Sequence, residues 1–290
     1  MQKFKVHEDN EIGIRLDVFL SNKLPNYSRA YVQKYIDKSV KVNEEDSRSS
    51  YKTKFNDLVE IDLAYDLNPI FDSIEIPIIY EDNNCIVIDK PLGLLSHSKG
   101  NYSSEATVES FIADKITGFN GSRAGIVHRL DRGTSGVMIC AKNPESYIWL
   151  QKQFSTRKVK KTYFAIITGK MSQDEAIIDL PIARNPKSPA TFKVSSNGKE
   201  AITRYKVIKT SPKYSLIRLE PKTGRTHQLR VHLSYLGHSI VGDTFYKGKT
   251  AERLYLHANA LEIKLPNNEI KVFESPIPKE FIKLLKNDNV

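Results

Sequence analysis

The apolar positions of the first seventy residues follow two spacings. One face of a first predicted helix carries Leu16, Phe19, Leu20 and Leu24. A second helix is predicted after Ser28, a residue type that caps helix N-termini, with the apolar face Val32, Tyr35 and Ile36. Short runs at 40–43 and 58–63 predict strands. We therefore expect a small α/β domain over residues 1–66 and a linker over residues 67–76, which include Asn68-Pro69.

Residues 77–290 show a different pattern, in which short apolar runs are separated by turn residues. Strands are predicted at 85–88, 137–140, 162–167, 202–207 and 214–219, and residues 78–83 lead into the first of them. A helix is predicted to begin at Asn143, because a capping residue, a proline and an acid follow one another there. Another is expected after Thr226 as its cap, with Leu229, Leu233 and Leu236 on the buried side. This region is expected to be a second, larger domain.

Composition narrows the class of protein. Hydrophobic residues make up 40% and charged residues 27%, which is ordinary for a globular chain of 290 residues. The polar start lacks the apolar core of a signal peptide, and no apolar run approaches the roughly 20 residues that span a bilayer. The two cysteines, Cys85 and Cys140, lie in apolar runs and supply neither a disulfide framework nor a metal-ligand pattern. We expect a soluble protein of the reducing cytoplasm.

The charge is unevenly distributed. The formal net charge is +10, and residues 136–290 hold 27 basic against 13 acidic side chains. A positive excess favours a polyanionic partner. Its densest part is the cluster Arg157-Lys158-Val159-Lys160-Lys161, which is either a solvated turn or a set of phosphate contacts. For Lys158, Lys160 and Lys161 we favour the phosphate contacts.

The strongest candidate for chemistry is the run from 125 to 140. It places one carboxylate, Asp131, between Arg129 and Arg132, directly before a buried strand. Neighbouring guanidinium groups favour the ionised carboxylate, which can serve as a nucleophile or general base. From spacing alone, a surface ion pair or an Asx turn explains Asp131 equally well.

The residues His128-Arg129-Leu130-Asp131-Arg132-Gly133-Thr134-Ser135-Gly136 resemble the catalytic motif of pseudouridine synthases of the RluA/RluD family. The resemblance implies that Asp131 is the essential catalytic residue. It also implies that His128 and Arg129 contact RNA or brace the loop. Residues Asp89-Lys90-Pro91-Leu92-Gly93 resemble another family motif, whose lysine-proline turn braces the active-site loop. His97 is interpreted as structural or as an RNA contact.

Three further segments extend the resemblance. Tyr163 matches the tyrosine whose ring stacks on the target base. The segment 223–233 resembles a third motif and implies that Arg230 pairs with Asp131, with Arg225 as an RNA contact. Residues 253–258 match an element in which Leu256 packs against the flipped base. For both Tyr163 and Leu256, an ordinary core position is the alternative.

Residues 1–66 resemble the alpha-L type RNA-binding domain. The matching positions are 15–20, Ser28-Arg29, Gln33, Ile36, 40–43 and Asn56-Asp57. The sequence departs from this pattern at Lys38-Ser39, where a glycine is usual, and at the acidic turn 43–46. The resemblance implies RNA contacts by Arg29 and Lys34, and a solvated basic helix face is the alternative.

Together these resemblances imply an enzyme that isomerises uridine to pseudouridine in RNA without a cofactor. They imply an α+β catalytic domain over residues 77–290, with a mixed, mostly antiparallel sheet and an active-site cleft. Large-subunit ribosomal RNA is the expected substrate, transfer RNA is the alternative, and a monomer is the default. A non-catalytic RNA-binding or ribosome-assembly factor is a second hypothesis, and a hydrolase using Asp131 with His128 is a third. A metal site built from His227, His232 and His238 is not favoured, because their spacing does not match that of a zinc pair.

Overall fold

The computed structural model describes residues 2–24, 32–33, 36, 40–62, 74–97, 105–119 and 123–287. The chain divides into two compact units, Met1–Ile74 with Ser98–Ala106, and Glu75–His97 with Thr107–Val290. Most of the second predicted helix and of the linker lies outside the described residues, as do Arg29 and Lys34. Within the described ranges, no helix combines the length and the apolar character needed to cross a membrane.

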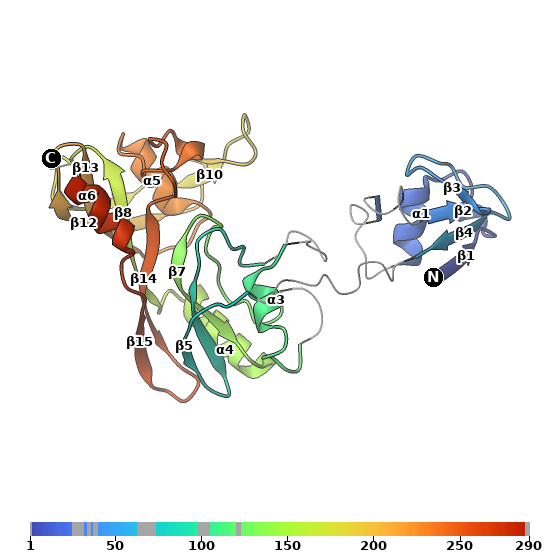
Figure 1. The fold of residues 1–290 in the computed structure, drawn as a ribbon, viewed down its shortest axis with the longest axis horizontal. Coiled ribbons are helices and arrows are strands. Elements are labelled where there is room, and N and C mark those ends of the chain that lie inside the picture. Colours follow the sequence, from blue (N-terminus) through green and yellow to red (C-terminus); the bar gives the residue numbers. More distant parts are fainter. Residues whose placement is uncertain are drawn as a thin grey trace. The chain divides into compact units, whose positions relative to one another are not determined.

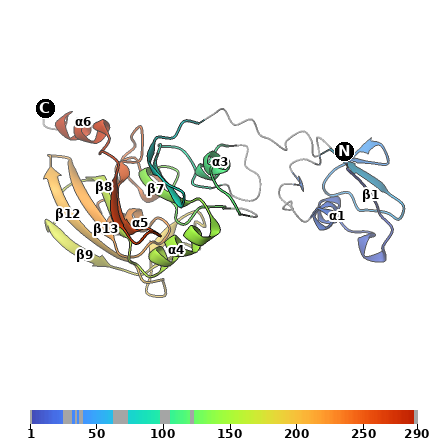
Figure 2. The ribbon, with the colours of Figure 1, turned by 90° about the horizontal axis from the view of Figure 1, so that it is seen from below.

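In the residues that the structure describes, the smaller unit is a twisted antiparallel sheet with a helix packed on it (Figures 1 and 2). Its strands are β1 (Gln2–Lys5), β2 (Val40–Val42), β3 (Glu45–Asp46) and β4 (Leu58–Ile61), in the order β1-β4-β2-β3. A 3-10 turn, Asp9–Glu11, precedes α1 (Leu16–Lys23). The predicted apolar face of α1 is confirmed, because Leu16, Phe19, Leu20 and Leu24 are all buried against the strands.

The acidic turn between β2 and β3 has a local explanation. Asn43 and Glu44 both have positive φ angles, 52° and 71°, as a tight hairpin turn requires. The Asn43 side chain donates to Asp57 at 2.9 Å and accepts from the Leu58 amide at 2.8 Å. These bonds tie the turn to β4. The departure from the usual sequence is therefore accommodated without loss of the hairpin.

The larger unit is built on a nine-stranded sheet (Figure 1). Its strands are β5 (Ile78–Glu81), β6 (Cys85–Lys90), β7 (Ser135–Ala141), β8 (Lys160–Thr168), β9 (Glu175–Asp179), β12 (Ile202–Thr210), β13 (Tyr214–Pro221), β14 (Leu256–Lys264) and β15 (Ile270–Glu274). They run in the order β5-β6-β7-β14-β8-β13-β12-β9, and β15 pairs with β14. Only the β7–β14 pair is parallel among the pairs described, so the expected mixed, mostly antiparallel α+β fold is confirmed.

The remaining elements of this unit flank the sheet. They are α3 (Val108–Ile112), α4 (Pro144–Ser155), α5 (Gln228–Tyr235), α6 (Lys279–Asn287), the 3-10 turn Thr244–Tyr246 and the small hairpin β10 (Ile182–Arg184) with β11 (Phe192–Val194). The predicted cap of α4 is confirmed, because the Asn143 side chain accepts from the Ser146 amide at 2.9 Å. Leu150 of α4 packs into the same core as β6 and β7. Cys85 and Cys140 are buried, as predicted.

The predicted start of α5 is wrong by one residue. The N-cap is His227, whose φ of 56° lies in the left-handed region, and not Thr226. Leu229 and Leu233 are buried as expected, but Leu236 is 39% exposed. Leu236 is the C-cap of the helix, where the backbone leaves the face that the two other leucines share.

Candidate active site

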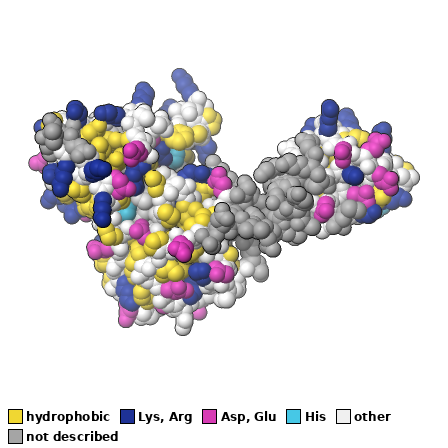
Figure 3. All heavy atoms as spheres, viewed as in Figure 1, with side chains coloured by type: hydrophobic (Ala, Val, Ile, Leu, Met, Phe, Trp, Pro, Cys, Tyr) yellow, Lys and Arg dark blue, Asp and Glu magenta, His cyan; other side chains and the backbone are white. Residues whose placement is uncertain are grey.

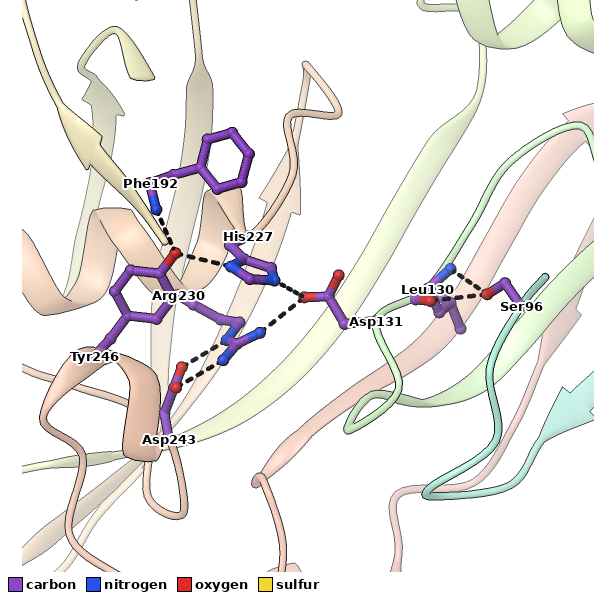
Figure 4. Close-up of polar contacts among 8 residues, drawn as sticks. All are labelled: Ser96, Leu130, Asp131, Phe192, His227, Arg230, Asp243 and Tyr246. Atoms are coloured by element: carbon purple, nitrogen blue, oxygen red, sulfur yellow. Dashed lines mark hydrogen bonds and ion pairs between the residues drawn. The ribbon is translucent and has the colours of Figure 1, made fainter. Parts of the chain in front are cut away.

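The loop from 128 to 134 is held from several sides. The Ser96 hydroxyl accepts from the Leu130 amide at 3.0 Å and donates to its carbonyl at 2.8 Å (Figure 4). The Thr134 amide donates to the Asp131 carbonyl at 3.0 Å, and the Gly93 amide donates to Arg132 at 3.0 Å. Asp131 therefore stands on a fixed loop, with 20% of its side chain exposed.

The buried side chain of Lys90 also supports the loop from 128 to 134. Its side chain is fully buried, and its Nζ donates to the carbonyls of Pro91 at 3.0 Å and Leu94 at 2.8 Å, with Arg132 at 3.5 Å. Burial lowers the pKa of Lys90 to about 8, and the charge of Asp131 opposes that shift. The side chain thus links the turn after β6 to the loop that carries Asp131.

Arg230 is the guanidinium that pairs with Asp131. Its Nη1 lies 3.2 Å from Asp131 Oδ2, across 99 residues of sequence. Its other face is held by Asp243, with Nε to Oδ2 at 2.7 Å and Nη2 to Oδ1 at 2.8 Å (Figure 4). Burial alone would lower the pKa of Arg230, but the bonds and charges of the two carboxylates outweigh it and raise that pKa. This is the pairing with Asp131 that the resemblance implied for Arg230.

His227 lies on the other side of the same carboxylate oxygen. Its Nε2 is 3.8 Å from Asp131 Oδ2, and its Nδ1 is 2.8 Å from the Tyr246 hydroxyl. That hydroxyl accepts from the Phe192 amide at 2.9 Å. Burial lowers the pKa of His227, although the charge of Asp131 opposes the shift. An uncharged imidazole therefore faces the carboxylate.

These groups open into a pocket of about 460 Å³, within the size range of small-molecule sites. Tyr163 from β8 and Leu256 from the start of β14 both line it, together with Asp131 and Arg230. Burial and the nearby charge of Asp131 raise the pKa of the Tyr163 hydroxyl, which therefore stays protonated at neutral pH. The space combines one ionisable carboxylate with an aromatic ring and an apolar wall.

His128 has a structural position. Its Nε2 accepts from the Ile139 amide at 3.0 Å, and its ring stacks on Phe154 with the centroids 4.5 Å apart. Burial lowers the pKa of His128 to about 3, so the ring is neutral. Of the two predicted roles, this geometry favours bracing of the loop. Since Nε2 is occupied by a backbone amide, the geometry also opposes the hydrolase hypothesis with His128 as base.

The predicted basic contacts are separated in the structure. The described residues that line the pocket include Arg129, Lys161 and Arg225 but neither Lys158 nor Lys160. Lys158 and Lys160 are exposed, and Lys160 pairs with Glu262 at 2.7 Å. The cluster is therefore not one continuous wall of the pocket. Figure 3 shows many Lys and Arg side chains over the part of the larger unit that carries β12, β13 and α6.

The three histidines considered for a metal have separate partners. His232 bonds to the Leu180 carbonyl at 2.9 Å, and His238 bonds to the Thr168 carbonyl at 3.0 Å. His227 faces Asp131 and Tyr246. In the described part of the chain, no group of three His, Cys, Asp or Glu side chains is arranged to hold a metal ion.

Sequence reasoning missed Ser96, Asp243 and Tyr246, and it considered His227 only as a metal ligand. Asp243 follows Ile240-Val241-Gly242, in a segment that matches no motif. The structure buries its carboxylate completely, and a buried carboxylate requires a compensating cation. The structure identifies that cation as Arg230.

Comparisons with known proteins agree with this arrangement. A family model described as RNA pseudouridylate synthase matches residues 84–235. Ribosomal large subunit pseudouridine synthase D of Borreliella burgdorferi is 37% identical, covering 99% of this chain and 92% of that protein. An uncharacterized RNA pseudouridine synthase of Aquifex aeolicus is 39% identical, covering 86% of this chain and 81% of that protein. The solved structure of human RNA Pseudouridylate Synthase Domain Containing 4 is 28% identical, with a TM-score of 0.59, and the match covers 72% of this chain and 92% of that chain. The chain therefore belongs to the RNA pseudouridylate synthase family and is an RNA pseudouridine synthase of the RluA/RluD type.

Proposed function

We propose that this enzyme converts specific uridines of large-subunit ribosomal RNA to pseudouridine, with Asp131 as the reacting group. The observation that carries the proposal is the half-buried Asp131 carboxylate, which lines the pocket of about 460 Å³ and is paired with Arg230 at 3.2 Å. The ribosomal substrate is supported by the name of the relative from Borreliella burgdorferi. A cytoplasmic location, predicted from the sequence, fits that substrate. Action as a monomer also remains a prediction.

The chemistry is an isomerisation, so its atoms balance without a cofactor. The bond between uracil N1 and ribose C1′ breaks, the uracil turns, and C5 bonds to C1′. C5 loses its proton and N1 gains one. Asp131 can act on the ribose or on the base in this sequence, and Arg230 stabilises its negative charge in either case. Arg230 and His227 both face Oδ2, and we assign Oδ1 to the substrate.

We assign the binding of the flipped uracil to Tyr163 and Leu256. Removing a base from its stack costs about a few kcal/mol, and an aromatic ring that stacks on the base offsets part of that cost. Because the Tyr163 hydroxyl stays protonated, its ring acts as a neutral surface rather than as a base. Leu256 closes the apolar side of the pocket.

RNA phosphates would be held by basic side chains around this pocket and on the smaller unit. Arg129, Lys161 and Arg225 line the pocket and are the first candidates. Exposed Lys158 and Lys160 extend the basic surface. We also propose that residues 1–66 form an RNA-binding domain in which Arg29 and Lys34 contact RNA. Such contacts position a substrate without reading its sequence.

Pseudouridine mapping of total RNA tests the proposal. Cells are compared with the gene intact, deleted, and carrying Asp131→Asn or the control Asp114→Asn, whose carboxylate is 75% exposed. We expect the same ribosomal sites to be lost in the deletion and in Asp131→Asn and to be kept in Asp114→Asn. Sites that survive in Asp131→Asn would refute the role of Asp131. Loss confined to transfer RNA would refute the ribosomal substrate, and no loss in the deletion would favour a non-catalytic RNA-binding protein.

A further inference from the structure

His227 lies within the third motif, but neither the resemblance nor the pairing of Arg230 with Asp131 gives this side chain a role. Its left-handed backbone, with φ of 56°, starts α5 and places the imidazole in the pocket wall. One ring nitrogen faces Tyr246 and the other faces Asp131, so the ring bridges a structural residue and the reacting carboxylate (Figure 4). The side chain is only 16% exposed.

The hydrogen bonds of Tyr246 favour one of the two ring nitrogens of His227 as the site of the proton. A backbone amide can only donate, so Phe192 N–H donates to the Tyr246 hydroxyl. We assign the hydroxyl proton to the bond with His227 Nδ1, 2.8 Å away, so that Nδ1 accepts it. A neutral imidazole has one N–H, which this arrangement places on Nε2. Nε2 is the nitrogen that lies 3.8 Å from Asp131 Oδ2.

The charges around the ring agree with a neutral donor. Asp131 and Asp243 favour the protonated imidazolium, whereas burial and the guanidinium groups of Arg230 and Arg129 disfavour it. Burial is the largest of these effects, and the pKa of His227 is lowered. The N–H on Nε2 is therefore present across the neutral pH range without a second positive charge beside Arg230.

We propose that His227 is a positioning residue whose Nε2–H, together with Arg230 Nη1, holds Asp131 Oδ2 and so directs Oδ1 at the uridine. The proposal rests on the proposed function of Asp131. A separation of 3.8 Å is longer than a hydrogen bond, and catalytic hydrogen bonds of this kind tighten when substrate binds. Two donors on one oxygen fix the rotation of the carboxylate, which one donor does not.

Two substitutions of His227 distinguish positioning of Asp131 from a structural role confined to the start of α5. Asn places an acceptor where Nδ1 lies, keeps the bond to Tyr246 and adopts the left-handed backbone readily, but it does not reach Asp131. Gln places an N–H where Nε2 lies and reaches Asp131, but it fits the backbone less well. A positioning role predicts higher activity for His227→Gln, and a local structural role predicts higher activity for His227→Asn.

The assay uses the full chain and a large-subunit ribosomal RNA transcript labelled with tritium at uridine C5, which is released when C5 bonds to the ribose. We expect kcat to fall about 100-fold in His227→Asn and less than about tenfold in His227→Gln, with KM within about threefold in both. Equal kcat values, or a higher value for His227→Asn, would overturn the proposal. Asp131→Asn is run beside them, and product formation by that variant would instead overturn the proposed function.

Tyr246→Phe provides a second measurement that does not alter His227 itself. It removes the hydroxyl that sets the proton on Nε2 and leaves the ring in place. We expect kcat to fall about tenfold with KM unchanged, in protein whose thermal unfolding shows that it is folded. An unchanged kcat would overturn the proposal even if His227→Gln failed to fold.

Discussion

Asp243 provides the sharpest test of how the site is held. Its side chain is completely buried and makes two charge-assisted bonds to Arg230, at 2.7 and 2.8 Å. Asp243→Ala leaves a guanidinium that is 7% exposed with Asp131 as its remaining carboxylate partner among the described residues. The substitution Asp243→Ala therefore leaves the buried positive charge of Arg230 only partly compensated.

The expected cost follows from that geometry. Removing one member of a buried ion pair typically costs about 3–5 kcal/mol of unfolding free energy. Asp131 still compensates part of the charge of Arg230, so we expect about 3 kcal/mol. In the background Arg230→Met, Asp243 is itself a buried carboxylate without its cation, so Asp243→Ala should cost about 1 kcal/mol or less. The coupling energy between the two residues is then at least about 2 kcal/mol.

Urea unfolding of the four proteins measures this coupling. The chain has a single tryptophan, Trp149 on α4, whose Nε1 donates to the Lys264 carbonyl at 3.0 Å. Its fluorescence therefore reports on the larger unit alone. A coupling energy below about 0.5 kcal/mol would refute the idea that Asp243 compensates Arg230. The activity of Asp243→Ala should also fall, because Arg230 is no longer held beside Asp131.

Four further predictions concern the same unit. A Cβ at Gly136, where φ is +112°, would lie 2.1 Å from the Ala258 carbonyl oxygen, so Gly136→Ala should lower the unfolding free energy by about 4 kcal/mol or prevent folding. Gly93→Ala, with a positive φ but open space, should cost about 1 kcal/mol in the same urea assay. Because the lowered pKa of His128 keeps it neutral when folded, stability should fall as pH drops from 6.5 towards about 3, and urea midpoints at pH 7 and 4.5 should differ less in His128→Leu. Asn143→Ala should cost about 1 kcal/mol by removing the cap of α4, and an unchanged urea midpoint would contradict that assignment.

The candidate active-site residues that belong to sequence motifs could be predicted from the sequence. The structure brings Asp131, Arg230, Tyr163 and Leu256 to one pocket, as the resemblance implied. The residues that hold them were not accessible, because Asp243 belongs to a loop segment without a motif. Its function depends on a contact with α5 that periodicity does not encode. Tyr246 was missed for the same reason, since its partners lie on a different element.

The sequence predicted where several strands lie along the chain, but it did not predict their order in the sheet. β6, β7, β8, β12 and β13 were each expected near their observed positions. The strand that joins them, β14, does not read as an apolar run, because His257 interrupts it. That histidine is buried and bonds to Ser135 at 2.9 Å and to the Ser275 carbonyl at 3.1 Å. A buried, hydrogen-bonded polar side chain thus makes this central strand difficult to predict from the pattern of apolar residues.

The place of β14 has a consequence for how the protein is made. This strand, Leu256–Lys264, lies between β7 and β8, although it follows both by about a hundred residues. During synthesis the chain is complete through β13 while the facing edges of β7 and β8 still await the strand that joins them. Unpaired strand edges are sites of aggregation, and pairings between distant segments form slowly. The newly made enzyme is therefore prone to aggregation until Leu256–Lys264 has been synthesised and has paired with both strands.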